Sequence, residues 1–310
     1  GHQSNSLRLI APNKQEYAMR GVKKSAIRFL NAVAFKNESF GHELEGTFAE
    51  KFLLDFYTTT HPYTPFAVGN LAESINVFHS DPQLYYIPRQ KALGDFNYDY
   101  GDELYMIEER FSDSPDDLKM LNGASTTMNT LDMMKNLQKS EKYSVDQQSY
   151  IRARIFDMLL GDWDRHYDQW RWAEYKDGNS YVYKAIPKDR DQAFSKYDGL
   201  LFKFIMQMPP LRHMQSFKED IRNIKWLNRE PYPLDLAFLK NATEEDWKKE
   251  AEYIQQNMTD EIIDNAFHNL PKEVQDGTIE HIKQNLKIRR SKMVHYATEY
   301  YKTLQKTIMI

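Results

Sequence analysis

Short apolar runs bounded by proline, glycine and asparagine predict strands in the first 110 residues. Residues 7–24 have the pattern of a β-hairpin, with a turn at residues 12–14. Two further runs, 84–87 and 103–107, also lie between turn-forming residues and read as strands.

Helical spacing is present in the same part of the chain. Leu44, Phe48, Phe52 and Phe56 recur at every fourth position, so we expect a helix over residues 43–57. A second, shorter helix is expected near residues 66–77. The first 110 residues therefore combine strands with one or two helices.

The pattern becomes mainly helical beyond residue 110. Helices are predicted over residues 129–139 and 144–160, the second with Ser144 and Gln147 spaced as a capping box. Two strands, 169–174 and 181–186, are joined by a hairpin-type turn. After residue 194 the chain is predicted to be almost wholly helical. Thr243 with Asp246 is expected to cap one helix, and Thr259-Asp260 to begin another. One or two long helices are expected over residues 277–308.

Composition narrows the class of protein. With 310 residues, 41% of them hydrophobic, the chain can form one large domain or two lobes. Its 41 basic and 45 acidic residues are spread along the sequence, so a nucleic-acid partner is not expected. The absence of cysteine excludes disulfides, thiolate catalysis and cysteine-bound zinc. No apolar run is long enough to predict a transmembrane segment.

Charged side chains that could take part in catalysis or metal binding are dense in two short segments. Residues 159–170 and 186–194 together hold five aspartates, two arginines, a histidine and two tryptophans. Carboxylates at this density repel one another unless a positive charge lies among them. A divalent metal, a phosphate-bearing ligand with its metal, or interleaved arginines would each supply that charge.

The order of these groups suits phosphoryl transfer. Such a site needs a carboxylate near the acceptor hydroxyl, oxygen ligands for Mg²⁺ and a cation over the phosphates. Arg20 lies on an early predicted strand, Asp164 follows a predicted helix, and Asp189 and Asp191 follow a later strand. Between the two halves, Ile107-Glu108-Glu109 falls where a linker would present backbone groups to a nucleotide base.

These motifs resemble those of the atypical protein-kinase-like superfamily, which includes lipid kinases, HipA-type kinases, spore-coat kinases and secretory-pathway kinases. The Asp164-Arg165-His166 segment is similar to their Asp-Arg-His catalytic loop. The segment from Asp189 to Phe194 is similar to the Asp-x-Asp-x-Ala-Phe metal segment of the spore-coat kinases. Tyr17 to Arg20 resembles the strand that carries the phosphate-binding lysine, with arginine in its place.

The resemblance implies an α+β, bilobal protein-kinase-like fold, with a β-rich N-lobe over residues 1–110 and a mainly helical C-lobe over residues 111–310. It implies that the chain binds ATP or another nucleoside triphosphate and Mg²⁺, and transfers the γ-phosphoryl group to a hydroxyl-bearing acceptor. The acceptor's identity stays open.

The same resemblance assigns roles residue by residue. Asp164 would be the catalytic base, Arg165 and His166 would order its loop, and Arg20 would contact the phosphates. Metal ligands would be Asp189 with Asp191, together with Gln169, which stands where the family often has Asn or Glu. The nucleotide-binding set is completed by Ile107, Glu108 and Glu109 and by a helix carboxylate that would pair with Arg20, either Glu50 or Asp55.

Three departures keep other functions open. Arginine replaces lysine at position 20, neutral Gln169 is a weaker Mg²⁺ ligand than a carboxylate, and no glycine-rich phosphate loop is present. A catalytically inactive pseudokinase that binds a nucleotide or a partner is therefore the main alternative. A metal-dependent phosphoesterase built on the same aspartates is a third interpretation.

Structural interpretations also compete for the same residues. Asp162, Asp164 and Asp168 with Arg165 are also typical of a capping and salt-bridge cluster. The tryptophans at 163, 170 and 172 are expected in the core, and the basic run 287–292 is expected on a solvated helix face.

A looser resemblance bears on localisation. Residues 108–110 and 161–172 resemble kinase-like regions attached to bacterial envelope phosphoesterases. It implies a bacterial envelope or periplasmic location rather than a cytoplasmic one, and a place within a larger envelope protein.

Overall fold

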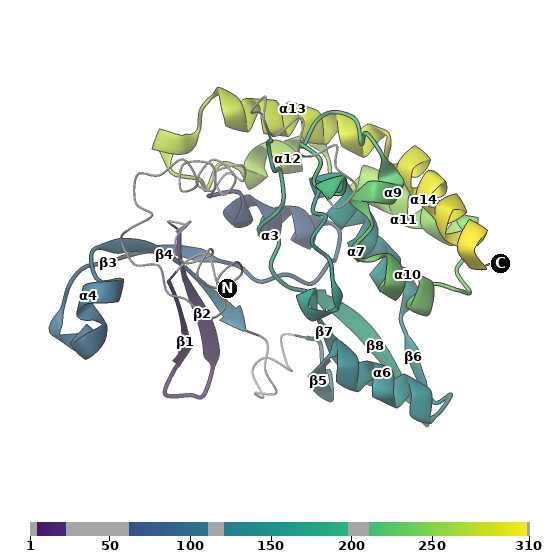
Figure 1. Cartoon of the computed structure of the whole chain (residues 1–310), viewed down its shortest axis with the longest axis horizontal. Coiled ribbons are helices and arrows are strands. Elements are labelled where there is room, and N and C mark those ends of the chain that lie inside the picture. Colours follow the sequence, from purple (N-terminus) through teal and green to yellow (C-terminus); the bar gives the residue numbers. More distant parts are fainter. Residues whose placement is uncertain (1–4, 23–61, 111–120, 198–210, 309–310) are drawn as a thin grey trace. The chain divides into compact units, whose positions relative to one another are not determined.

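The structure is a computed structural model that describes residues 5–22, 62–110, 121–197 and 211–308 (Figure 1). The chain divides into two compact units. The N-terminal unit comprises Gly1–Pro62 and Ser80–Ser112, and the C-terminal unit comprises Tyr63–His79 and Asp113–Ile310. The helix expected over residues 43–57, with Glu50 and Asp55, lies outside the described residues.

The N-terminal unit is built on an antiparallel four-stranded sheet in the order β1-β2-β4-β3. Its strands are β1 (Ser6–Ile10), β2 (Glu16–Gly21), β3 (Gln83–Ile87) and β4 (Glu103–Arg110). The predicted hairpin and both later strands are confirmed. A 3₁₀ turn, η3 (Lys91–Phe96), and a single helical turn, α4 (Asn97–Tyr100), connect β3 to β4.

Two helices of the C-terminal unit begin at the capping residues predicted from the sequence, Thr243 and Thr259. Thr243 and Asp246 form a capping box, and Thr259 and Asn129 cap their helices. The long C-terminal helical region is two helices, because the chain bends at Lys292. Within the described residues, the helices of this unit are α3 (Pro65–Ser74), α6 (Thr130–Lys139), α7 (Gln147–Leu160), α9 (Ile224–Leu227), α10 (Tyr232–Phe238), α11 (Glu244–Asn257), α12 (Asp260–Ala266), α13 (Gly277–Ser291) and α14 (Met293–Ile308), with short 3₁₀ turns η4 (Tyr167–Gln169) and η6 (Lys272–Val274).

A second four-stranded sheet lies in the C-terminal unit, in the order β5-β7-β8-β6. The predicted strand pair is confirmed as β7 (Trp170–Asp177) and β8 (Ser180–Pro187). Two short strands were not expected from the sequence, β5 (Thr126–Asn129) and β6 (Tyr143–Val145). They have few residues and become strands only by pairing with β7 and β8, so their own sequence carries little periodic signal.

The start of α7 corrects one prediction. Ser144 lies in β6, where it pairs with Val182 of β8, so it does not cap the helix. Instead the carboxylate of Asp146 accepts a hydrogen bond from the backbone N–H of Ser149 at 3.0 Å. Parallel pairing with β8 keeps the chain extended through Val145, so the helix begins at Gln147, three residues later than predicted.

Helix α7 forms the centre of the C-terminal unit. Every residue from Tyr150 to Leu160 is buried except Arg152, and the helix contacts α11, α13, α14 and β8. The ring of Tyr150 lies against Trp170 and Trp172, whose rings are buried as expected. This packing fixes the end of α7, from which the charged loop starts.

The α+β class, with a strand-rich N-terminal region and a mainly helical C-terminal region, is confirmed. The lobe boundary at residue 110 stays a prediction; helix α3, which precedes it in sequence, contacts α12 and belongs to the C-terminal unit. No helix within the described ranges is long and apolar enough to cross a membrane.

The position of the α7 cap is testable by stability. Replacing Asp146 with Ala should lower the free energy of unfolding by about 1 kcal/mol, because an N–H at the helix start loses its acceptor. Ser144→Ala should change it by less than about 0.5 kcal/mol, because Ser144 is exposed. Urea unfolding followed by tryptophan fluorescence measures both, and a larger loss for Ser144→Ala would contradict this assignment.

Candidate functional site

The charged loop begins where α7 ends at Gly161. Gly161 has φ 72°, and a Cβ at this position would lie 3.0 Å from Nη1 of Arg289 and 3.3 Å from the ring of Phe217. Glycine is therefore required both by the left-handed backbone and by the close approach of these side chains. The reversal at Gly161 directs residues 162–169 away from the helix axis.

Arg289 of α13 closes the carboxyl end of α7. Its Nη1 donates to the carbonyls of Met158 and Leu159 at 3.3 and 3.2 Å, and its guanidinium lies 4.5 Å from the centre of the Phe217 ring. A cation at this end offsets the partial negative charge of the last carbonyls. The expectation of a solvated basic face at 287–292 is wrong for Arg289, which is 1% exposed, because α13 packs this side chain under α7.

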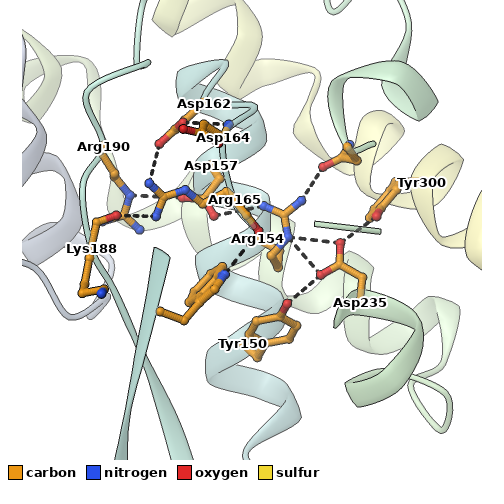
Figure 2. A network of polar contacts seen from close by, with 12 residues as sticks. Tyr150, Arg154, Asp157, Asp162, Asp164, Arg165, Lys188, Arg190, Asp235 and Tyr300 are labelled. Atoms are coloured by element: carbon orange, nitrogen blue, oxygen red, sulfur yellow. Dashed lines mark hydrogen bonds and ion pairs between the residues drawn. The ribbon is translucent and has the colours of Figure 1, made fainter. Parts of the chain in front are cut away.

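Arg165 joins the loop to the segment after β8. Its guanidinium is buried and donates from Nη1 to the carbonyl of Lys188 at 2.7 Å and from Nη2 to that of Asp189 at 2.5 Å. The same Nη2 lies 2.9 Å from Oδ2 of Asp162 (Figure 2). The two segments that concentrate the charged residues are therefore tied together through one side chain.

A second chain of contacts runs beside Arg165, as Figure 2 shows. Asp157 of α7 accepts from Nε of Arg190 at 3.1 Å and from Nη1 of Arg154 at 3.0 Å. Nε of Arg154 also donates to Asp235 of α10 at 3.0 Å. All four side chains are buried.

Two tyrosine hydroxyls bind Asp235, at the end of this series of contacts that lies farthest from Arg190. Asp235 accepts from the hydroxyls of Tyr150 at 2.8 Å and of Tyr300 at 2.6 Å, and Arg154 also donates to Asn228 at 2.5 Å. With Asp162 and Arg165, three buried arginines thus face three buried carboxylates: Arg154, Arg165 and Arg190 against Asp157, Asp162 and Asp235.

Asp164 differs from these buried carboxylates because its side chain is 28% exposed. Oδ1 lies 3.7 Å from Nε2 of His166. Partial burial is the main cause that raises the pKa of Asp164, and Asp191 adds to it, while His166 and Arg165 act in the opposite direction. A carboxylate with a raised pKa that stays accessible to solvent is suited to accept a proton.

His166 and Gln169 organise the remainder of the loop. The Nδ1 atom of His166 accepts from the backbone N–H of Asp168 at 3.2 Å and so caps η4. The carbonyl of Gln169 accepts from the backbone N–H of Lys188 at 2.9 Å, a second tie between the loop and the segment after β8. Metal binding by the Gln169 side chain stays a prediction.

Asp189 and Asp191 lie at the end of β8, close to the loop. Electrostatic repulsion from Asp191 contributes to the raised pKa of both Asp162 and Asp164, so the three carboxylates belong to one cluster. Burial lowers the pKa of Arg165, but attraction to nearby carboxylates, chiefly that of Asp162 and also that of Asp189, outweighs burial and raises this pKa.

The donor atoms in this cluster suit a hard cation. Among the residues that the structure describes, no three acidic or histidine side chains form a group able to hold a metal by themselves. Mg²⁺ is commonly held by one or two carboxylates, with water and substrate phosphates as the other ligands. The carboxylates of Asp189 and Asp191 could supply two oxygens to a cation held in that way, whereas a site closed entirely by protein ligands does not fit.

The nucleotide-binding residues predicted in the N-terminal unit form a separate group. Arg20 on β2 pairs with Glu108 on β4, with Nη1 and Oε1 at 3.1 Å, and the other Glu108 oxygen accepts from Ser80 at 2.6 Å. Ile107, Glu108 and Glu109 lie within β4 rather than in a linker, because they pair with Met19, Ala18 and Tyr17. The ladder between β3 and β4 ends at Gln83 and Ile107.

Sequence reasoning did not select Arg154, Asp157, Asp235 or Arg289. Arg154 and Asp157 did carry a signal, since they stand three residues apart in the otherwise apolar stretch 153–160 of a predicted helix. Oppositely charged residues at this spacing, within a helix that is apolar all round, indicate a buried pair. Asp235 and Arg289 carry no comparable local signal, because their partners lie far away in sequence.

No protein-family model matches the chain, and no curated protein sequence matches it. Among solved structures, the chain is similar to the crystal structure of a Helicobacter pylori proinflammatory kinase, CtkA. The two are 11% identical, the alignment covers 98% of this chain and 97% of that chain, and the TM-score is 0.49. These values describe a loose likeness over almost the whole length of both chains.

The buried role of Arg165 is testable by stability. Arg165→Met should lower the free energy of unfolding by about 3–5 kcal/mol, because it leaves the buried Asp162 carboxylate and two carbonyls without their donor. Arg165→Lys should cost less, since it keeps the charge but reaches fewer acceptors. Arg229→Met, at a half-exposed pair with Glu230, serves as the control and should cost less than about 1 kcal/mol in the same urea unfolding experiment.

Proposed function

We propose that the chain is a kinase-like phosphotransferase that binds a nucleoside triphosphate with Mg²⁺ and transfers its γ-phosphoryl group to a hydroxyl. The observation that carries this proposal is the contrast within one loop. Asp162 and Arg165 are buried and paired, while Asp164 between them keeps an accessible carboxylate with a raised pKa. A loop held this firmly can present one carboxylate to a substrate in a fixed position.

Asp164 would act on the acceptor. The acceptor oxygen forms a bond to the γ-phosphorus while the bond from that phosphorus to the bridging oxygen breaks, and the nucleoside diphosphate leaves. The hydroxyl proton passes to the Asp164 carboxylate. His166, whose Nε2 lies 3.7 Å from Oδ1 of Asp164, would help to orient this carboxylate when its ring is protonated.

Asp189 and Asp191 would hold Mg²⁺, with Gln169 as a neutral ligand. When bound, Mg²⁺ would neutralise the charge that develops on the phosphate oxygens. The contacts from Arg165 to the carbonyls of Lys188 and Asp189 support this assignment, because they fix the metal segment against the catalytic loop.

Arg20 would neutralise phosphate charge from the N-terminal unit. Its guanidinium cannot lose its proton and can donate two parallel hydrogen bonds to a phosphate. The Glu108 carboxylate, itself held by Ser80, orients Arg20 in a way that resembles the pairing of a phosphate-binding lysine with a glutamate. Ile107, Glu108 and Glu109 remain the proposed base-binding segment.

Removal of the proposed base tests the function directly. Asp164→Asn should lower the rate of phosphoryl transfer from radiolabelled ATP, to the protein itself or to an added hydroxyl acceptor, by roughly 10²–10⁴-fold. Its thermal stabilisation by ATP with Mg²⁺ should be retained, because Asp164 is not assigned to nucleotide binding. Asp177→Asn, an exposed aspartate on the β7–β8 turn, should leave both measurements unchanged.

Other outcomes identify the alternatives. If the wild-type chain is stabilised by ATP and Mg²⁺ but transfers no phosphate, it is a nucleotide-binding pseudokinase, as Arg20 and Gln169 suggest. If Asp164→Asn transfers phosphate at the wild-type rate, Asp164 is not the base. Hydrolysis of a phosphodiester without nucleotide would favour the phosphoesterase interpretation.

The raised pKa of Asp164 predicts how the activity depends on pH on the acid side of its optimum. Transfer requires the ionised carboxylate, so kcat/KM should fall as the pH drops through a pKa above the ordinary aspartate range. Glu230 contributes to raising this pKa, so Glu230→Gln should lower it and move the acid limb to lower pH. The profile of Asp177→Asn should match that of the wild type, and an upward shift for Glu230→Gln would contradict the electrostatic explanation.

A further inference from the structure

The segment from Asp189 to Phe194 is held in a strained backbone conformation. Both of its terminal residues have positive φ, 51° for Asp189 and 59° for Phe194. A bulky side chain such as phenylalanine rarely adopts this conformation, and each such residue costs about 1–3 kcal/mol. Contacts around the segment must therefore stabilise a conformation that its own backbone disfavours.

Contacts with α7 and the catalytic loop supply this stabilisation at both ends. Arg165 donates to the carbonyls of Lys188 and Asp189 at the first end, and the backbone N–H of Phe194 donates to the carbonyl of Leu160 at 3.0 Å at the other. Phe194 also packs against Phe217 and Phe267. The middle of the segment is anchored separately, through Arg190.

Arg190 lies between the two proposed metal ligands and points away from solvent into the protein. Its Nε donates to Asp157, and its guanidinium lies 4.8 Å from the centre of the Phe156 ring. Its Nη2 is buried and has no hydrogen-bond partner among the described residues. One donor of a guanidinium that is otherwise paired with Asp157 is therefore left unsatisfied, and this lowers the stability that the buried pair contributes.

Asp157 is itself fixed on its other side. Oδ2 accepts from Arg154, whose Nε is paired with Asp235, and Asp235 accepts from the hydroxyls of Tyr150 and Tyr300 (Figure 2). These contacts leave the Asp157 carboxylate little freedom to follow movements of Arg190. Arg190 is therefore held in place, through Asp157, by the buried centre of the C-terminal unit.

We propose that Asp157 and Arg190 are positioning residues that set the geometry of Asp189 and Asp191 for binding a divalent cation. Arg190 is covalently joined to both aspartates, so anchoring its side chain on Asp157 fixes the backbone from which the two carboxylates project. The metal-binding role of these aspartates rests on the proposed function. The dependence of that site on a buried ion pair outside it is the additional inference.

The experiment measures cation binding without turnover. Mn²⁺ is titrated into the intact chain and free Mn²⁺ is followed by electron paramagnetic resonance. Arg190→Met should weaken Mn²⁺ binding by about 10-fold or more, in the range found when residues that orient metal ligands are replaced. It should still fold, because Asp157 keeps Arg154 as a partner. Arg190→Lys, which keeps the charge, should recover part of the affinity.

Tyr300→Phe is the matched control. It removes one hydrogen bond from the far end of the same buried network, and should cost about 1 kcal/mol of stability. Its Mn²⁺ affinity should stay within about twofold of the wild type, because the pair of Asp157 with Arg190 is intact. Urea unfolding of each variant separates a loss of stability from a loss of metal binding.

The possible results are distinct. The positioning role is overturned if Arg190→Met binds Mn²⁺ as the wild type does, if Tyr300→Phe loses as much affinity as Arg190→Met, or if the wild type does not bind Mn²⁺. If the Mn²⁺ affinities follow the expected order but no phosphoryl transfer is found, the positioning role stands and the proposed transferase activity fails.

Discussion

The pairing of three buried arginines with three buried carboxylates is the constraint on which the C-terminal unit depends. Charges removed from water are stable only if each meets an opposite charge in good geometry. Arg154, Arg165 and Arg190 come from a helix, a loop and a strand end, and they meet aspartates from three different elements. Helix α7, the charged loop, the segment after β8 and helix α10 must therefore assemble together.

This constraint explains why the proposed site is rigid although it is made of loops. Arg165 donates to two carbonyls of the segment after β8, and Arg289 donates to two carbonyls at the end of α7. The buried polar groups of the loop, such as Asp162 and Arg165, thus have their partners inside the protein. Asp164 is the carboxylate of this loop that combines partial exposure with a raised pKa, and the proposed chemistry is assigned to it for that reason.

The charged loop has two interpretations, as a salt-bridge cluster and as a phosphate site, and each applies to different residues. A salt-bridge cluster accounts for Asp162 and Arg165, which face inward, and the proposed phosphate site is formed by carboxylates that lie outside that pair. Scaffold and site therefore share one stretch of sequence. The positive φ of Asp189 and Phe194 shows where the scaffold imposes a conformation on the proposed metal segment.

Much of the element order was determined by the sequence. Hydrophobic spacing, turn residues and capping residues such as Thr243 and Thr259 act over a few positions, so they predicted the strands of the N-terminal sheet, the β7–β8 hairpin and several helix starts. The clustering of five aspartates likewise marked the candidate site, because it can be seen within two short segments.

Tertiary structure decided what depends on distant partners. Strands β5 and β6 exist only by pairing with β7 and β8, and this pairing moved the cap of α7 from Ser144 to Asp146. The sequence did not indicate which charges are buried, because Asp235 and Arg289 contact partners that lie about 80 and 130 residues away along the chain. Burial and ion pairing are properties of the packed interior, so a sequence pattern can name the charged residues but cannot assign them to scaffold or to site.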